Sequence, residues 1–309
     1  MSIFRDIPEG AFTSPVLTIG SFDGVHVGHH RIVSALLNEA RQTSGDAVVL
    51  TFTAHPRKVI TPETPPRILT TTDEKVRALG ALGVSNIILL DFTREMASMS
   101  AAEFINDIVL KKMGVVHIVV GYDHAFGKDR EGTFEFLREL SHRRGFGVTR
   151  VEPRNFYSRP ISSTWIRAEL EDGGIAAAAA LLGRNYTLSG EVTRGAGRGR
   201  TLGFPTANVV PSDRDKVVPK DGVYAVRVMI GRSRPAKGML NIGTNPTFAN
   251  TERTIEVNIF DLDEDLVGAE LELEFVRRLR DEVKFASVDE LVAQIRRDRE
   301  DALAALGEC

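Results

Sequence analysis

Residues 16–30 of this 309-residue chain are VLTIGSFDGVHVGHH, and three features of this stretch decide the fold of the first half. Val16–Ile19 is a short apolar run rich in β-branched residues, which is typical of a buried strand. A glycine-rich turn follows it, and His30–Arg41 then has the apolar spacing of a helix. In such a strand–turn–helix unit, the first backbone N–H groups and the helix dipole favour an anion. The stretch therefore predicts an anion-binding turn.

The same alternation of short apolar runs and amphipathic stretches continues through the first half. Further buried strands are predicted at Ala47–Phe52, Asn86–Leu90, Val116–Val120 and Gly147–Val151. Helices are predicted between them at Asp73–Leu82, Ala101–Met113 and Thr133–Arg144. Alternating strands and helices form a parallel sheet that is covered on both faces. Because ligands bind beyond the carboxyl ends of such strands, the loops after the strands are the expected site.

The pattern changes after Trp165. Ile166–Leu182 is predicted to be one helix, with an alanine run, and Gly183 is its expected end. Strands separated by Gly, Pro and Asp clusters follow, which predicts an antiparallel sheet or small barrel. These strands are Tyr186–Val192, Val223–Ile230, Lys237–Ile242, Thr254–Phe260 and Glu270–Val276. A last helix, Val288–Leu306, has Ser287 at the N-cap and Glu290 at the capping-box position. We place the domain boundary at about Gly183–Tyr186, which gives domains 1–183 and 184–309.

Composition narrows the class of protein. A length of 309 residues suggests two domains, and 39 basic against 42 acidic residues give a net charge of −3. That balance argues against a dedicated nucleic-acid binder. The single Cys309 excludes a disulfide scaffold and a cysteine-rich zinc module. The charged first residues do not form a secretory leader, and the longest apolar run, Ile175–Leu182, is too short to span a membrane. We expect a cytoplasmic monomer or weak oligomer without a membrane partner.

Two histidines in the opening turn are candidate ligand-binding residues. His26 and His29 are three residues apart with Gly28 between them. The glycine lets a phosphate approach the backbone, and the imidazoles can donate hydrogen bonds to its oxygens. A turn with surface histidines and a metal site are the alternatives, although no third metal ligand lies nearby in the sequence. His30 and Arg31 are expected to be solvated.

The densest motif of the second half is RGAGRGRTLGFPTAN, residues 194–208. Glycines with arginines are found in RNA-binding tails, but this tract is short and lacks interleaved aromatic residues. A backbone cradle for phosphates with arginines nearby fits the composition better.

The string GSFDGVHVGHH resembles the FMN adenylyltransferase module of prokaryotic FAD synthetases, and its His-x-Gly-His element resembles the signature of the nucleotidyltransferase superfamily. Three further segments resemble that module in the right order: TFTAHP at 51–56, GYDHAFG at 121–127 and SSTWIR at 162–167. Many members have an aromatic residue followed by a polar or basic one where this chain has His124 and Ala125. The nucleotide contacts of that loop are therefore the part of the resemblance in doubt.

The resemblance implies roles for residues of the first half. Catalytic roles fall on His26, His29 and Arg167. ATP and phosphate contacts fall on Gly20, Phe22, Asp23, Gly24, Gly28, Asp123, Ser162, Ser163 and Thr164. Flavin contacts fall on His55 and Pro56. Taken alone, the Ser-Ser-Thr run fits a helix N-cap equally well. Arg167 in the first turn of a helix opposes the helix dipole, which favours a phosphate partner for it.

The segment GFPTAN, residues 203–208, resembles the riboflavin kinase signature. The resemblance implies that Thr206 and Asn208 hold Mg2+ and ATP, and that Glu256 is the general base. It also implies ATP contacts from Gly197, Arg200 and Gly203. Flavin contacts are implied for Asn241, Gly243, Arg280 and Phe285. By strand alternation Glu256 faces the same way as Thr254 and Asn258, and alternation alone would make it a solvated residue.

Taken together, the resemblance implies a Rossmann-like domain followed by a small antiparallel β-barrel with a C-terminal helix. It implies that riboflavin is phosphorylated by ATP to FMN, and that FMN is then adenylylated to FAD with release of pyrophosphate. The first step needs a base because an alcohol must lose a proton. The FMN phosphate of the second step is already an anion, so positioning and charge neutralisation suffice. A different nucleotidyltransferase and a non-enzymatic flavin sensor are the alternatives.

Overall fold

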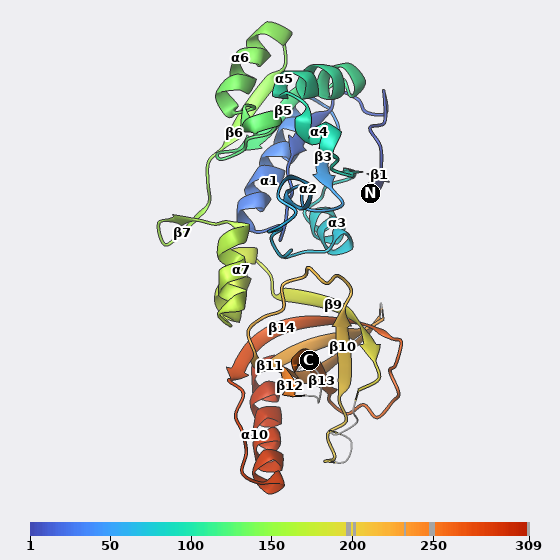
Figure 1. Ribbon diagram of the computed structural model, residues 1–309. Coiled ribbons are helices and arrows are strands. Elements are labelled where there is room, and N and C mark those ends of the chain that lie inside the picture. The colour runs from blue at the N-terminus through green and yellow to red at the C-terminus, as the bar shows by residue number, and fades with distance from the viewer. Residues whose placement is uncertain (196–198, 200–201, 232, 247–250, 308–309) are drawn as a thin grey trace. The chain divides into compact units, whose positions relative to one another are not determined.

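The computed structural model describes residues 1–195, 199, 202–231, 233–246 and 251–307 (Figure 1). The chain forms two compact units, Met1–Ser163 and Thr164–Cys309. Each unit is described by itself below. None of the helices in the described ranges has the length and apolar character needed to cross a membrane.

The first unit is built on a six-stranded parallel sheet. Its strands, in spatial order, are β1 (Ser2–Phe4), β4 (Asn86–Leu90), β3 (Ala47–Phe52), β2 (Val16–Ile19), β5 (His117–Gly121) and β6 (Gly147–Val151). All neighbouring strands pair in parallel, which confirms the predicted class. The edge strand β1 was not predicted, because three residues are too few to show a period.

Helices cover both faces of this sheet. On one face, α1 (Val27–Gln42) and α3 (Thr72–Ala81) bury residues such as Leu36 and Leu79 against Val49 and Ile87. On the other face lie α5 (Ala101–Glu103), the π-helix Phe104–Lys112 that continues it, and α6 (Phe134–Arg144). Alternate residues of each strand enter the two cores, as expected for a sheet buried on both sides.

Several short elements of the first unit were not predicted. They are α2 (Arg57–Ile60), α4 (Arg94–Ser98), the 3-10 turn Lys128–Arg130 and the hairpin of β7 (Asn155–Phe156) and β8 (Arg159–Pro160). Each spans five residues or fewer, which is too short for a hydrophobic period to be recognised.

The prediction of one continuous helix over Ile166–Leu182 is wrong. Two helices occupy this stretch, α7 (Ser163–Glu171) and α8 (Ile175–Leu182). Gly173 between them has a φ of +84°, a left-handed conformation that ends the first helix. Gly183 ends α8 with a φ of +78°, as predicted.

The second unit contains a closed six-stranded barrel. Its antiparallel strands are β9 (Tyr186–Thr193), β10 (Ala207–Pro211), β11 (Gly222–Ile230), β12 (Arg234–Pro246), β13 (Thr251–Ile259) and β14 (Glu270–Arg280). Pairing of β10 with β9 closes the circle β10-β13-β12-β11-β14-β9. The strand β10 was not predicted, because Thr206–Asn208 resembles a turn.

The last helix, α10, spans Val288–Leu306 as predicted (Figure 1). The Ser287 side chain accepts a hydrogen bond from Glu290 N at 3.2 Å, which confirms the N-cap. Ala302 and Leu306 bury this helix against Ala225 and Met239 of the barrel. The helix therefore covers one side of the barrel wall.

Candidate active sites

The carboxyl ends of β2 and β5 mark the place in the first unit where a ligand is expected. These two strands are neighbours, and the strand order reverses between them. In open α/β sheets the ligand crevice lies at such a switch point. The loop after β2 contains His26, and the loop after β5 contains Asp123. The fold thus brings two of the predicted loops to one edge of the sheet.

The turn after β2 has a strained backbone. Phe22 and Val25 have φ values of +47° and +40°, and Gly24 has a φ of +84°. A β-branched residue such as Val25 rarely adopts positive φ. The side chains of Phe22 and Val25 are fully buried in the core, and this packing offsets the strain. Strain of this kind is concentrated at functional sites.

His26 and His29 cap the first turn of α1 reciprocally. The Nδ1 atom of His26 accepts a hydrogen bond from His29 N, and Nδ1 of His29 accepts one from His26 N, both at 3.3 Å. The two rings stack with their centroids 3.6 Å apart. Because both Nδ1 atoms are acceptors, each neutral ring carries its proton on Nε2. The cap therefore fixes the proton of each neutral histidine ring on Nε2.

Gly28 lies close to this stack. A Cβ atom at position 28 would lie 3.0 Å from Cε1 and Nδ1 of the His26 ring. His26 is only 6% exposed, so the alternative of a turn with two surface histidines is wrong. Glycine at position 28 thus avoids crowding of the His26 ring and leaves the backbone accessible.

Asp23 holds the turn from inside the protein. Its carboxylate accepts hydrogen bonds from Leu69 N at 2.9 Å and from Thr70 N at 3.0 Å. The Thr70 hydroxyl oxygen also accepts a hydrogen bond from Gly24 N at 3.0 Å. The buried carboxylate therefore shapes the turn, and the ATP contacts implied for Asp23 and Gly24 remain predictions.

The Ser-Ser-Thr segment reaches the same turn through one described contact. The Ser163 hydroxyl donates to the carbonyl of Asp23 at 2.9 Å, over a sequence separation of 140 residues. Thr164 and Arg167 belong to the second compact unit. Their phosphate contacts, and those of Ser162, remain predictions.

The loop after β5 contains an unusual buried imidazole. His124 has its Nε2 atom shielded from solvent and without a hydrogen-bond partner, and its ring lies 5.5 Å from Phe126. Burial, and secondarily the charge of Arg130, lowers the pKa of His124 to about 4. The ring is therefore neutral at neutral pH. Asp123, implied as an ATP ligand, is exposed beside it.

The predicted flavin residues of the first unit lie after β3. His55 Nδ1 accepts a hydrogen bond from Arg57 N at 3.2 Å, and Pro56 is the N-cap residue of α2. Since β3 is parallel to β2, both residues follow the same edge of the sheet as the histidine turn. Their contact with flavin remains a prediction.

Two residues near the turn behave differently from what the sequence suggests. His30 is half-buried and its Nε2 pairs with the carbonyl of Val25 at 3.0 Å, so the prediction that it is solvated is wrong. Lys75 is only 5% exposed and its Nζ donates to Phe52 O at 2.8 Å, yet it was not among the predicted residues. The signal for Lys75 was its position on the apolar stripe of α3, beside Val76 and Leu79.

In the barrel, strand register assembles the predicted kinase residues. On β13, Glu256 pairs with Asn208 of β10 on one side and with Asn241 of β12 on the other. The Thr206 hydroxyl donates to Glu256 Oε2 at 3.4 Å, and the Thr254 hydroxyl donates to Oε1 at 3.5 Å. Glu256 is half-buried rather than fully solvated. Its carboxylate therefore accepts hydrogen bonds from two threonine hydroxyls, and two asparagines flank Glu256 in the strand register.

This carboxylate lines a cavity of about 320 Å3. Five residues implied by the resemblance contribute to its wall: Thr206, Asn241, Glu256, Arg280 and Phe285. The apolar part of the wall, which was not predicted, includes Val223, Met239, Leu240, Leu291 and Ile295. An apolar cavity of this size with a few convergent polar groups is typical of a small-molecule site.

Arg280 is held in the cavity wall by a residue of α10. Its Nε and Nη2 atoms bind Asp298 at 2.8 Å and 2.6 Å, and its guanidinium lies 5.9 Å from the Phe285 ring. Asp298 also accepts a hydrogen bond from Gln294 at 2.8 Å. The charge of Arg280 is thus compensated within the protein. Its direct contact with flavin, and that of Gly243, remain predictions.

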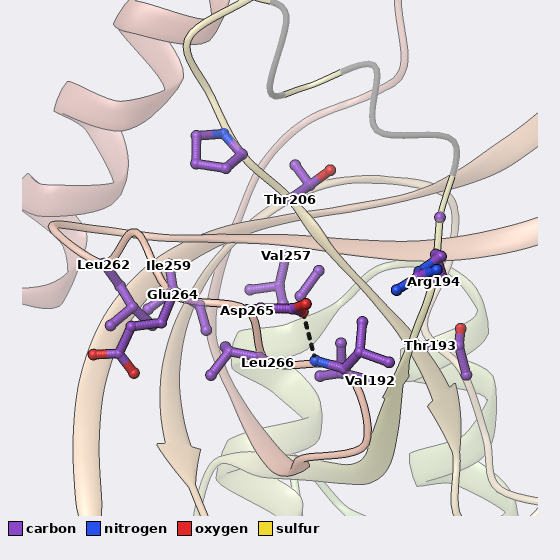
Figure 2. Close-up of a pocket in the computed structure, with 14 residues that line it drawn as sticks. Val192, Thr193, Arg194, Thr206, Val257, Ile259, Leu262, Glu264, Asp265 and Leu266 are labelled. Atoms are coloured by element: carbon purple, nitrogen blue, oxygen red, sulfur yellow. Dashed lines mark hydrogen bonds between the residues drawn. The ribbon is translucent and has the colours of Figure 1, made fainter.

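A second cavity, of about 360 Å3, also has Thr206 in its wall (Figure 2). Figure 2 shows Arg194, Thr206 and Asp265 in its wall. The Asp265 carboxylate accepts a hydrogen bond from Val267 N at 3.1 Å. Thr206 lines both cavities. Of the implied phosphate ligands, Gly203 has a φ of +81°, and Gly197 and Arg200 lie outside the described residues.

Comparison with known proteins matches both halves of the chain. Residues 10–165 match the FAD synthetase family, and residues 182–306 match the riboflavin kinase family. The bifunctional riboflavin kinase/FMN adenylyltransferase of Escherichia coli K12 is 40% identical over 283 residues, covering 92% of this chain and 90% of that protein. The protein of the same description from Bacillus subtilis is 34% identical over 292 residues, with coverages of 93% and 91%.

A solved structure described as a macrolide-efflux protein from Streptococcus pneumoniae has the same fold. It superposes with a TM-score of 0.87 at 35% sequence identity, over 97% of this chain and 98% of that one. Its description names a different activity, whereas both family matches and the curated relatives name flavin enzymes. The chain belongs to the family of bifunctional riboflavin kinase/FMN adenylyltransferases.

Proposed function

We propose that this protein phosphorylates riboflavin with ATP and then transfers AMP from a second ATP to FMN, giving FAD and pyrophosphate. The observation that carries the proposal is that Glu256 and Thr206 meet at one cavity of the barrel, with Asn208 paired in register beside Glu256. A flavin-binding protein without catalysis has no need of a half-buried carboxylate beside this threonine. We assign the adenylyltransferase to residues 1–183 and the kinase to residues 184–309.

In the kinase reaction, Glu256 accepts the proton of the flavin's terminal ribityl hydroxyl. The hydroxyl oxygen attacks the γ-phosphorus of ATP, the bond to the β–γ bridging oxygen breaks, and ADP leaves. We place the flavin in the cavity that Glu256 lines and the nucleotide in the cavity of Figure 2. Thr206 borders both cavities, so the phosphoryl group would cross beside its hydroxyl.

Thr206 and Asn208 suit a magnesium ion. Both carry uncharged side-chain oxygens, the hard ligands that Mg2+ combines with phosphate oxygens and water. The Glu256 carboxylate lies 3.4 Å from Thr206 and pairs in register with Asn208, so the donor set is compact. When bound, the ion would neutralise charge on the ATP phosphates.

In the adenylyl transfer, an FMN phosphate oxygen attacks the α-phosphorus of ATP and pyrophosphate leaves. No proton has to be removed, so the site needs donors rather than a base. The Nε2–H groups of His26 and His29 at the start of α1 supply such donors. We assign the remaining phosphate contacts to Ser162, Ser163, Thr164 and Arg167, as the resemblance implies.

The proposal is tested by incubating the purified protein with Mg-ATP and riboflavin, and in parallel with Mg-ATP and FMN. Flavins are then separated by chromatography. We expect FMN followed by FAD in the first tube, and FAD in the second. Flavin bound tightly without turnover in either tube would favour a sensor and overturn the proposal.

A further inference from the structure

Lys75 is a buried cation beside the histidine turn that none of the implied roles uses. It lies in the first turn of α3, is 5% exposed, and shares its face of the helix with the core residues Val76 and Leu79. A buried ammonium group costs stability unless its donors are satisfied and its charge is compensated. Both conditions are met at this position by groups that also shape the turn.

The hydrogen bonds of Lys75 lead directly into the turn. Its Nζ atom donates to Phe52 O at 2.8 Å and to the Thr51 hydroxyl at 3.4 Å. That hydroxyl in turn donates to Ser21 O at 3.1 Å. Thr51 is completely buried, so this link is shielded from water. The ammonium group is therefore one hydroxyl away from the backbone that precedes the left-handed Phe22.

The charge of Lys75 is compensated from the same turn. Burial lowers the pKa of Lys75 to about 8, and the nearby carboxylate of Asp23 counteracts part of this effect. The strand β3 offers only the uncharged Thr51 and Phe52 at this position. On α3, the Glu74 carboxylate takes part in the helix cap, where it accepts a hydrogen bond from Thr71 N at 2.9 Å. The carboxylate of Asp23 thus stabilises the protonated form of Lys75.

We propose that Lys75 is a positioning residue for adenylyl transfer, which fixes the end of β3 and the Ser21 carbonyl so that the turn presents His26 and His29 to the phosphates. This inference rests on the proposed adenylyltransferase function. In its protonated form, Lys75 keeps its attraction to Asp23, whose carboxylate holds Leu69 and Thr70. Loss of the proton weakens the support of the turn without touching the barrel.

The test compares both activities of the same chain. Lys75→Met keeps much of the shape and removes the charge, while Thr51→Val removes only the linking hydroxyl. Lys111→Met, at an exposed position of the π-helix, is the matched control. FAD formation from added FMN is measured between pH 7 and pH 9.5 in each protein. FMN formation from riboflavin, which depends on the barrel, reports whether the chain is otherwise intact.

We expect kcat/KM for FAD formation to fall about 10- to 100-fold in Lys75→Met, and less in Thr51→Val, because a displaced donor misaligns the reacting groups. FMN formation and the control should stay within about twofold of the unmodified protein. In the unmodified protein, FAD formation should decline above about pH 8, following the pKa of Lys75, and Lys75→Met should show no such decline.

Unchanged FAD formation in Lys75→Met would overturn the inference. So would a profile of the unmodified protein that stays level to pH 9.5, and this result does not depend on whether any variant folds. An unmodified protein that makes no FAD from FMN at any pH would instead refute the proposed function itself.

Discussion

In the parallel-sheet unit, the two histidines of the proposed anion site lie in a single turn, whereas in the barrel the residues around Glu256 come from three different strands. His26 and His29 are oriented by the turn and helix that contain them. Glu256 obtains its neighbours from β10 and β12, and Thr206 is 50 residues away from it in the chain. The histidine pair is therefore part of one local turn and helix. The residues around Glu256 come together only when the strands of the barrel pair.

The two sites also differ in where their carboxylate lies. In the barrel, Glu256 faces a cavity, where it can accept the proton of an alcohol. In the first unit, the buried carboxylate of Asp23 accepts hydrogen bonds from Leu69 N and Thr70 N. Its negative charge therefore does not face an incoming phosphate. The donors that we propose for the phosphate are the ring Nε2–H groups of His26 and His29, whose Nδ1 atoms are engaged in the cap. The nature of the nucleophile explains the difference, because an alcohol needs a base and a phosphate does not.

Replacing Glu256 with Gln should give the largest separation of the two activities. General-base catalysis contributes about 10²- to 10⁴-fold, so FMN formation should fall by that factor. FAD formation from added FMN should stay within about twofold, since the first unit is untouched. Both rates are measured by flavin chromatography, with Glu270→Gln at an exposed position of the barrel as the control. Unchanged FMN formation would remove Glu256 as the base.

Replacing His29 with Ala should produce the reverse pattern. Loss of one donor to a transition-state oxygen costs about 10²- to 10³-fold, and FAD formation should fall accordingly. The variant also loses half of the reciprocal cap, which is worth about 1 kcal/mol. His29→Asn separates the effects, because its side-chain oxygen can accept His26 N without supplying an Nε2–H donor. FAD formation at the native rate in His29→Ala would contradict the assignment, and His142→Ala is the surface control.

Replacing Asp298 with Asn tests whether the barrel site depends on a distant element. Asp298 holds Arg280 in the cavity wall from α10, and an Asn cannot compensate the guanidinium charge. Allowing for the partial exposure of Arg280, we expect a loss of about 2 kcal/mol in stability. The KM for riboflavin should rise more than kcat falls, because the wall moves and the base does not. Asp301→Asn, exposed on the same helix, is the control, and an unchanged KM would contradict the wall's role.

The same contrast explains what the sequence could predict. The bounds of β2, β3, β4 and β6 follow directly from apolar runs, and the His-x-Gly-His element lies in one continuous turn. By contrast, β10 was missed because its first residues, Ala207 and Asn208, belong to a segment that resembles a turn. The break at Gly173 was missed because the alanine run that follows it outweighed two glycines.

Site residues follow the same rule. Strand alternation placed Glu256 beside Thr254 but could not show that Asn208 and Asn241 flank it, since register arises only on pairing. Lys75 and Asp298 were missed for a related reason. Both lie on helices whose charged residues are usually solvated, and only tertiary packing buries them. Supporting residues of a site are therefore harder to predict than the motif they support.

The smallest effect should come from His124, in the loop after β5. Its Nε2 is buried without a partner, so His124→Phe removes a polar atom at similar shape and should stabilise the first unit by about 1 kcal/mol at neutral pH. The pKa of His124 in the folded protein is about 4, below the ordinary value of 6.5. Below about pH 6.5 the unfolded chain therefore binds a proton that the folded chain does not.

It follows that the native protein loses stability through this residue as the pH falls from about 6.5 towards 4, and that His124→Phe does not. Urea denaturation at pH 7.5 and 5.5, with hydrogen exchange of the amides in β5 and α6, measures the difference. The control His142→Phe, on the exposed side of α6, should keep the native pH dependence. An equal loss of stability in His124→Phe would mean that the imidazole is solvated when the chain is folded. The loop after β5 would then be open, in contrast to the tightly held turn after β2.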